Sequence, residues 1–234
     1  MPWGCSSAAR ATVSNTVRRR FESCRPRPAR LSIGCASHHV LMSRQFFTSD
    51  LHLFHQFVQY LRGFDDDQAQ LESVREAFDG VRKNDVVYIL GDLCLGAGRL
   101  KTACAFMDSL PGRKRLIFGN HDVGHPAYRD ASAMMRRYAP SFESVSVLGQ
   151  VSIQGTPFLL NHMPYDGEGE NRPDMPERFS QWRFKDMGVP LIHGHTHSAT
   201  KVSRSARGTI QVHVGLDAHP ALVSADDVLE LVAP

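Results

Sequence analysis

Five short apolar runs in this sequence each end in acidic, amide or imidazole side chains. A run of this kind, bounded by glycine or another turn-forming residue, is typical of a buried strand and the turn that follows it. Any fold of this chain must therefore place several chemically reactive side chains at the ends of strands. The residues concerned are Asp50 and His52, Asp92, Asn120 with His121 and Asp122, His162, and His195 with His197.

The order of the remaining patterns predicts an α/β fold with more than one sheet, because strands and helices alternate early and short strands follow later. Three glycine-separated runs between Phe142 and Asn161 predict antiparallel hairpins. A length of 234 residues with 42% hydrophobic residues suits one larger domain, which we place at 42–234. The strands are predicted over 44–50, 85–92, 114–120, 189–197 and 209–217, and the helices over 68–81, 98–112, 131–138 and 224–232.

The polar strand ends have the composition of a metal site. Residues two apart in an extended chain point the same way, so Asp50 can converge with His52, and His195 with His197. Carboxylates, an amide oxygen and imidazoles without thiolates suit Mn²⁺, Fe or Zn better than they suit a structural cysteine zinc site. One such strand end alone would be an ordinary polar terminus, but five in one chain are difficult to attribute to turn chemistry. Seven potential ligands are about the number that two ions sharing a carboxylate require.

The ordered motifs DLH, GD, GNHD, a lone histidine and GHTH resemble those of the calcineurin-like metallophosphoesterase superfamily, from Asp50 to His197. The resemblance implies a four-layer αββα sandwich of two mixed β-sheets flanked by helices, and two divalent metal ions. Mn²⁺ is our first choice for these ions, with Fe, Zn or Ni as alternatives. It further implies that Asp92 bridges the metals, and that His121 is the catalytic histidine, oriented by Asp122. One metal would be held by Asp50, His52 and His197, and the other by Asn120, His162 and His195.

The activity implied is dimetal-dependent phosphoester hydrolysis. Protein phosphatases of the superfamily continue the GD motif with an arginine, whereas this chain reads GDLCLGAG. The difference favours small nucleotide-type phosphodiesters, cyclic or dinucleotide, over phosphomonoesters and phosphoproteins. The motifs also admit a nuclease of the same superfamily, or a non-catalytic metal-binding scaffold. The polar segment 163–186 could act as a lid that supplies positive charge, through Arg172, Arg178, Arg183 or Lys185.

Charge and cysteine content bear on partners and location. Residues 1–41 hold seven of the 27 basic and one of the 24 acidic residues, so 20 basic and 23 acidic residues remain in the rest. This mildly acidic body argues against a nucleic-acid partner, and no apolar run is long enough to span a membrane. Cys94 and Cys104 lie in apolar or helical surroundings, which suits a reducing cytoplasm. A small phosphoester substrate is the partner we expect; the oligomeric state stays open.

Residues 1–41 differ from the rest of the chain. They are rich in Arg and Ser, have no periodicity, and are expected to be disordered. Such a composition resembles a mitochondrial transit peptide. Alternatively, translation begins at Met42 and the preceding residues are a non-native extension, because RFES is what the TTCGA core of a transfer-RNA gene encodes in frame. The codons of residues 21–24 would distinguish the two.

Several further polar residues are predicted to have structural roles. His193 is expected in the core or behind the metal ligands. Asp217 is expected to accept hydrogen bonds from loop amides. The other histidines expected to be structural or exposed are His55, His125, His213 and His219.

Overall fold

The first of two sheets is built on four parallel strands. The computed structural model describes residues 43–169 and 176–233. In it β1 (Gln45–Thr48), β2 (Val86–Ile89), β3 (Arg113–Ile117) and β4 (Ser144–Ser146) pair in parallel, in that order. β10 (Val223–Ser224) adds to the free edge of β1 in the antiparallel direction. The sheet is therefore mixed, with order β10-β1-β2-β3-β4.

The second sheet has the order β5-β6-β7-β9-β8 and is also mixed. Its centre is parallel, because β6 (Thr156–Asn161), β7 (Leu191–His193) and β9 (Ile210–His213) run the same way. Both edges are antiparallel: β5 (Leu148–Ile153) forms a hairpin with β6, and β8 (Val202–Arg204) pairs with β9. The parallel strands of each sheet are the ones that lead into the reactive residues.

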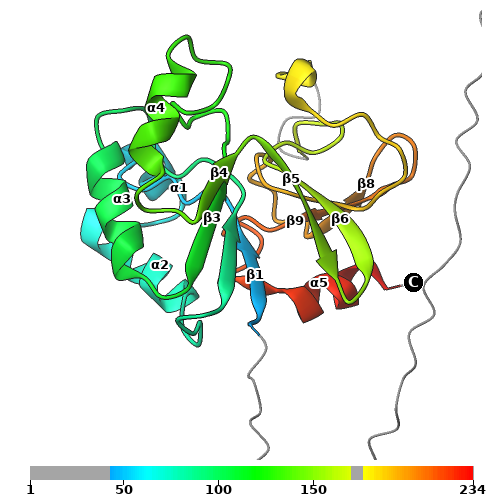
Figure 1. Cartoon of the computed structure of the whole chain (residues 1–234), viewed down its shortest axis with the longest axis horizontal. Coiled ribbons are helices and arrows are strands. Elements are labelled where there is room, and N and C mark those ends of the chain that lie inside the picture. The colour runs from blue at the N-terminus through cyan, green and yellow to red at the C-terminus, as the bar shows by residue number, and fades with distance from the viewer. Residues whose placement is uncertain (1–42, 170–175, 234) are drawn as a thin grey trace, which may run out of the picture. The chain divides into compact units, whose positions relative to one another are not determined.

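Two apolar clusters hold these layers together. One cluster joins the first sheet to α2 (Asp67–Ala77), α3 (Leu100–Ser109) and α4 (Ala131–Tyr138), which cover one of its faces (Figure 1). The other lies between the two sheets, where Phe47 and Leu90 of the first sheet belong to the same cluster as Phe158 and Ile192 of the second. Because burying apolar surface drives folding, the inter-sheet cluster fixes the two sets of strand ends beside each other.

The last helix, α5 (Ala225–Val232), closes one end of the inter-sheet cluster. Its Val228 is fully buried there. The Ser224 side chain accepts a hydrogen bond from the Asp227 backbone N–H, and the Asp227 carboxylate accepts one from the Ser224 backbone N–H. This reciprocal capping box satisfies N–H groups that a helix start otherwise leaves unpaired. In Figure 1 the helix runs along the lower side of both sheets.

The sequence predictions of two mixed sheets, flanking helices and α/β class are confirmed. The predicted helix 131–138 has the observed bounds of α4, and the other predicted elements are shorter in the structure by a few residues. One prediction was wrong: the run at Ser144–Ser146 is no hairpin strand but pairs in parallel with β3. The sequence patterns also failed to indicate four elements: α1 (Gln56–Leu61), β8, β10 and the 3-10 turn Ser180–Trp182.

Two further predictions concern the extent of the domain and the absence of a membrane-spanning segment. The described residues, 43–169 and 176–233, belong to one unit, and the predicted extension 1–41 lies outside them. Within the described part, none of the helices combines the length and apolar character needed to cross a membrane.

Candidate metal centre

The candidate site lies where parallel strands of both sheets end. Asp50 and His52 follow β1, Asp92 follows β2, and Asn120 and His121 follow β3; His162 follows β6, and His195 and His197 follow β7. Carboxyl ends of parallel strands are the usual place for ligand sites in open α/β sheets. Backbone hydrogen bonds align the segments that follow these strands, since His52 N–H donates to Asp92 O at 2.9 Å and Gly194 N–H donates to His162 O at 2.8 Å.

Five of the seven predicted ligands have left-handed backbone conformations, with φ between 45° and 72°. Such values are uncommon outside glycine and concentrate at functional sites. The expectation that an extended backbone aligns Asp50 with His52, and His195 with His197, was therefore wrong in its geometry. The side chains converge because the chain turns sharply at each ligand. The five residues are Asp50, His52, Asp92, His195 and His197.

Glycine at positions 91 and 119 permits the close approach of these turns. A Cβ atom on Gly91 would lie 2.6 Å from His162 Nδ1 and equally close to the Gly119 backbone. A Cβ on Gly119 would meet the Asp92 carboxylate and lie 2.6 Å from the Asp92 backbone nitrogen. Real Cβ atoms do not approach other atoms so closely, so these glycines allow the β2 and β3 exits to meet.

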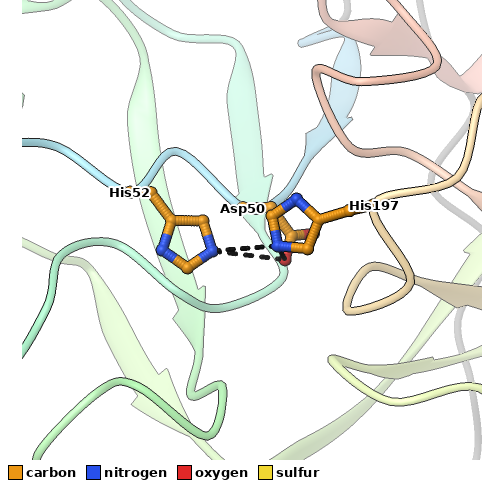
Figure 2. Close-up of side chains that lie close together, drawn as sticks. All are labelled: Asp50, His52 and His197. Carbon is orange, nitrogen blue, oxygen red and sulfur yellow. Dashed lines mark hydrogen bonds and ion pairs between the residues drawn. The ribbon is translucent and has the colours of Figure 1, made fainter. Parts of the chain in front are cut away.

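Asp50, His52 and His197 form the first ligand group. His52 Nε2 and His197 Nε2 are 3.2 Å apart, and Asp50 Oδ1 lies 3.9 Å and 3.6 Å from them (Figure 2). The other Asp50 oxygen accepts a hydrogen bond from Ser49 Oγ at 2.6 Å, and the His195 backbone N–H donates to both Asp50 oxygens, at 3.0 Å to Oδ2 and 3.2 Å to Oδ1. These contacts leave Oδ1 and two ring nitrogens facing one another, as three ligands of one ion would.

Asp92 and His162 form a second group that overlaps the first. Asp92 Oδ2 lies 3.5 Å from His52 Nε2 and 3.4 Å from His162 Nε2, which places this oxygen between the two groups. Asp50 also comes within reach of both groups. The bridging role of Asp92 stays a prediction, for which its central position is the structural support.

His162 provides the test of whether these residues fit a metal. Its Nδ1 donates to the Leu90 carbonyl at 2.7 Å, so the neutral ring would present the lone pair of Nε2 to a metal. That Nε2 atom is fully buried and makes no hydrogen bond to the described residues, although Asp92 Oδ2 lies 3.4 Å from it. Buried polar atoms normally find a partner, and an imidazole whose Nδ1 is held by a carbonyl is the usual form of a histidine metal ligand. The donor set therefore fits a divalent ion.

Asn120 and His195 lie together on the side of His162. His195 Nδ1 is 2.9 Å from Asn120 Oδ1, and the His195 and His162 ring centroids are 5.2 Å apart. His195 Nε2 lies 3.0 Å from Glu168 Oε2, so the Nε2–H group can donate a hydrogen bond to this carboxylate while Nδ1 keeps its lone pair for a metal. Glu168 is buried and also binds the guanidinium groups of Arg178 and Arg183.

Asp217 holds the other histidine of the GHTH motif. Its Oδ2 lies 2.8 Å from His197 Nδ1, and both of its oxygens accept hydrogen bonds from Arg62. The prediction that Asp217 serves loop amides was therefore wrong. Both carboxylates that orient ligand histidines, Glu168 and Asp217, were missed as functional residues. Glu168 sits in a polar segment and Asp217 follows a strand, and neither position indicates a distant histidine partner.

His121 and Asp122 differ from the predicted pair. The His121 side chain is 38% exposed in the cavity, with Nε2 3.9 Å from Asp92 Oδ2. The Asp122 carboxylate accepts three backbone hydrogen bonds, from Asp92, Leu93 and Gly119 at 2.8–3.1 Å. The expectation that Asp122 orients the His121 ring is corrected: its carboxylate is occupied in joining the β2 and β3 exits. Asp122 thus fixes the backbone that carries His121.

The buried charges of the site shift the pKa values of its groups. Burial lowers the pKa of His52 to about 3 and also lowers that of His195, which keeps both rings neutral for ligation. Burial opposes protonation of His162 too, but Asp92 and Asp50 outweigh it and raise the pKa of His162 to about 10. Without cations the carboxylates thus retain a proton on His162. A metal must displace that proton, since only the neutral ring ligates.

The remaining polar residues divide between the site and its surroundings. His55 lies closer to the candidate metal site than predicted, because its Nδ1 is 3.4 Å from His52 Nδ1 and its side chain lines the same cavity. His193 is fully buried behind the site, as predicted, beside His213. Of the segment 163–186, Arg178 lines the cavity and Arg183 is buried against Glu168; Lys185 is exposed, and Arg172 lies outside the described residues.

Comparisons with known proteins agree with this geometry. The Calcineurin-like phosphoesterase family matches residues 44–199. The chain is 40% identical over 201 residues to the Gene 66 protein of Mycobacterium phage L5, which covers 82% of this chain and 95% of that protein. The Gene 66 protein of Mycobacterium phage D29 is 41% identical over 201 residues, covering 82% and 96%.

A solved structure shares the fold. The crystal structure of a protein of unknown function from Aquifex aeolicus aligns with a TM-score of 0.58 and 20% identity, over 81% of this chain and all of that one. At 20% identity, this similarity supports a shared fold and nothing further. The family match covers more than half of the sequence and includes every predicted ligand, so the chain belongs to the calcineurin-like phosphoesterase family.

Proposed function

We propose that this protein is a dimetal-dependent phosphodiesterase that acts on small nucleotide-type substrates. The observation that carries the proposal is that two ligand groups share Asp50 and that Asp92 Oδ2 lies 3.5 Å from His52 Nε2 and 3.4 Å from His162 Nε2. A partly exposed His121 lines the same cavity. All of the ligand positions that the family motifs require are filled in this sequence. A scaffold with a decayed site would have lost some of them.

Each residue has a role that follows from its place. Asp50, His52 and His197 would hold one ion, Asn120, His162 and His195 the other, and Asp92 would contact both. Two ions supply Lewis acidity and make water a better nucleophile at neutral pH. His121, which is not needed as a ligand, faces the cavity and would give a proton to the departing oxygen.

The charges of the cavity favour a diester over a monoester. The position after the GD motif holds Leu93, which is fully buried and offers no cation to a phosphate. Among the described residues that line the cavity, both arginines are already paired, Arg62 with Asp217 and Arg178 with Glu168. A phosphomonoester carries up to two negative charges and a phosphodiester one, so the site suits the less charged ester.

Metal identity and location complete the proposal. The mixed oxygen and nitrogen ligands support Mn²⁺, with Fe, Zn or Ni as alternatives. A cytoplasmic location is supported by Cys94 and Cys104, which are buried free thiols.

Metal removal and restoration test the activity. The protein is chelated, dialysed and reloaded with Mn²⁺, Fe²⁺, Zn²⁺ or Ni²⁺, and kcat/KM is measured on bis(p-nitrophenyl) phosphate and on p-nitrophenyl phosphate. We expect Mn²⁺ to restore turnover, with the diester preferred. A faster monoester reaction would indicate a phosphatase instead. Metal uptake in elemental analysis without turnover of either ester would indicate a scaffold.

A further inference from the structure

The helix α1 (Gln56–Leu61) begins four residues after the ligand His52 and forms one wall of the metal cavity. Phe57 and Leu61 are four residues apart and therefore lie on the same side of this helix. Both line the cavity, although their side chains remain 63% and 65% exposed. Val58, between them, is buried and anchors the helix.

The cavity is larger than a phosphate group requires. Its volume is about 540 Å³, within the roughly 300–1,000 Å³ that small-molecule sites occupy. Five of the proposed metal ligands line this space, together with α1: His52, Asp92, Asn120, His195 and His197. A phosphate held there leaves room beside it for an organic group of the ester.

The side chains that line the cavity differ in chemistry from one element to the next. Among the described residues that line the cavity, the purely hydrocarbon side chains are Phe57, Val58 and Leu61, all from α1. The other walls carry imidazoles, carboxylates and the Arg178 guanidinium, whose partner Glu168 keeps it in place. Large exposed apolar side chains beside a polar site favour a ligand that covers them. An aromatic ring also gives a flat surface on which another ring can stack.

We propose that Phe57 and Leu61 form a specificity subsite that binds a flat, carbon-rich group of the substrate, of the nucleobase type. This inference rests on the proposed phosphodiesterase function and adds to it. The ligand groups would hold the phosphate, while the α1 subsite would select esters whose organic group stacks on Phe57.

The test uses two diesters with the same leaving group. Thymidine 5′-(p-nitrophenyl phosphate) carries a base and methyl p-nitrophenyl phosphate does not, so their ratio of kcat/KM measures the contribution of the nucleoside. We expect the Mn²⁺-loaded wild type to prefer the thymidine ester. Phe57→Ala should lower kcat/KM on that ester by about 5- to 50-fold, the range typical of losing one stacking partner. On the methyl ester the loss should stay below about twofold.

Variants on the same helix provide controls. Tyr60→Ala removes a ring that is 79% exposed and does not line the cavity, so it should leave both rates unchanged. Phe57→Tyr keeps a ring and should retain most of the preference, whereas Leu61→Ala should lower it. Metal content is measured on every variant, because the ligands are expected to stay loaded.

The outcomes separate this inference from the proposed function. If the wild type hydrolyses neither diester, the phosphodiesterase proposal fails. If it hydrolyses both with equal kcat/KM, or if Phe57→Ala lowers both rates alike, the subsite is refuted while the activity stands. An unchanged substrate ratio together with a shift of Phe57→Ala from dimer to monomer would show that α1 contacts a second copy of the chain instead.

Discussion

At the scale of single residues, the site separates side chains that can hold metal from one that can transfer a proton. Three ligand histidines are held by hydrogen bonds to groups that are not ligands: His162 to Leu90 O, His195 to Glu168 and His197 to Asp217. His121 is held through its backbone, whose N–H donates to Asp92 Oδ1 at 2.9 Å. Its ring can therefore act on a substrate while the ligands stay fixed.

Replacing His121 with alanine should reveal that separation. We expect metal content to stay at the wild-type level, because seven other side chains are available as ligands. The loss of a general acid typically costs about 10²–10⁴-fold in rate, but only where the departing oxygen needs a proton. His121→Ala should therefore impair nucleotide esters with a ribose leaving group severely and p-nitrophenyl esters only modestly. An equal fall of kcat on both, with the metals retained, would show that His121 positions the phosphate.

At the scale of elements, the sequence predicts those features that depend on local patterns. The helix over 131–138 and the strand ends carrying ligands follow from periodicity and turn residues. β4 was misread because alternation in one strand does not reveal its partner, which here is β3. The contacts of Glu168 with His195 and of Asp217 with His197 join segments 27 and 20 residues apart, so a linear reading does not indicate them.

These two carboxylates lead to a paired prediction about the loops that carry them. Glu168→Gln removes the charge that faces His195, and Asp217→Asn removes the one that faces His197. Loss of such an outer partner typically weakens metal binding by about 10- to 100-fold. We expect each variant to lose affinity for one ion only, measured by titrating the apoprotein with Mn²⁺ in a calorimeter. If either variant weakened the binding of both ions equally, the two loops would not have separate roles.

At the scale of the whole molecule, the candidate metal centre joins the two sheets. Asp50, His52, Asp92 and Asn120 come from the first sheet, and the remaining ligands follow β6 and β7 of the second. The inter-sheet cluster already fixes these strand ends beside each other through apolar burial. Near the same ends, Asp50 and Asp92 are fully buried carboxylates, and His162 keeps a proton beside them in the absence of cations. Metal binding should therefore stabilise the assembled pair of sheets.

Chelation should lower the melting temperature of the protein reversibly. A ligand at about 100 times its Kd adds about 2.7 kcal/mol to the stability of the folded state. In a chain of this size 1 kcal/mol shifts Tm by about 2–4 °C, so saturating Mn²⁺ should raise Tm by roughly 5–10 °C above the chelated protein. Asp92→Asn should reduce that rise more than any other ligand substitution, because Asp92 lies against both ligand groups. Phe57→Ala, which alters only the α1 wall, should respond to Mn²⁺ like the wild type. If Tm is unchanged after elemental analysis confirms metal loss, the centre does not hold the two sheets together.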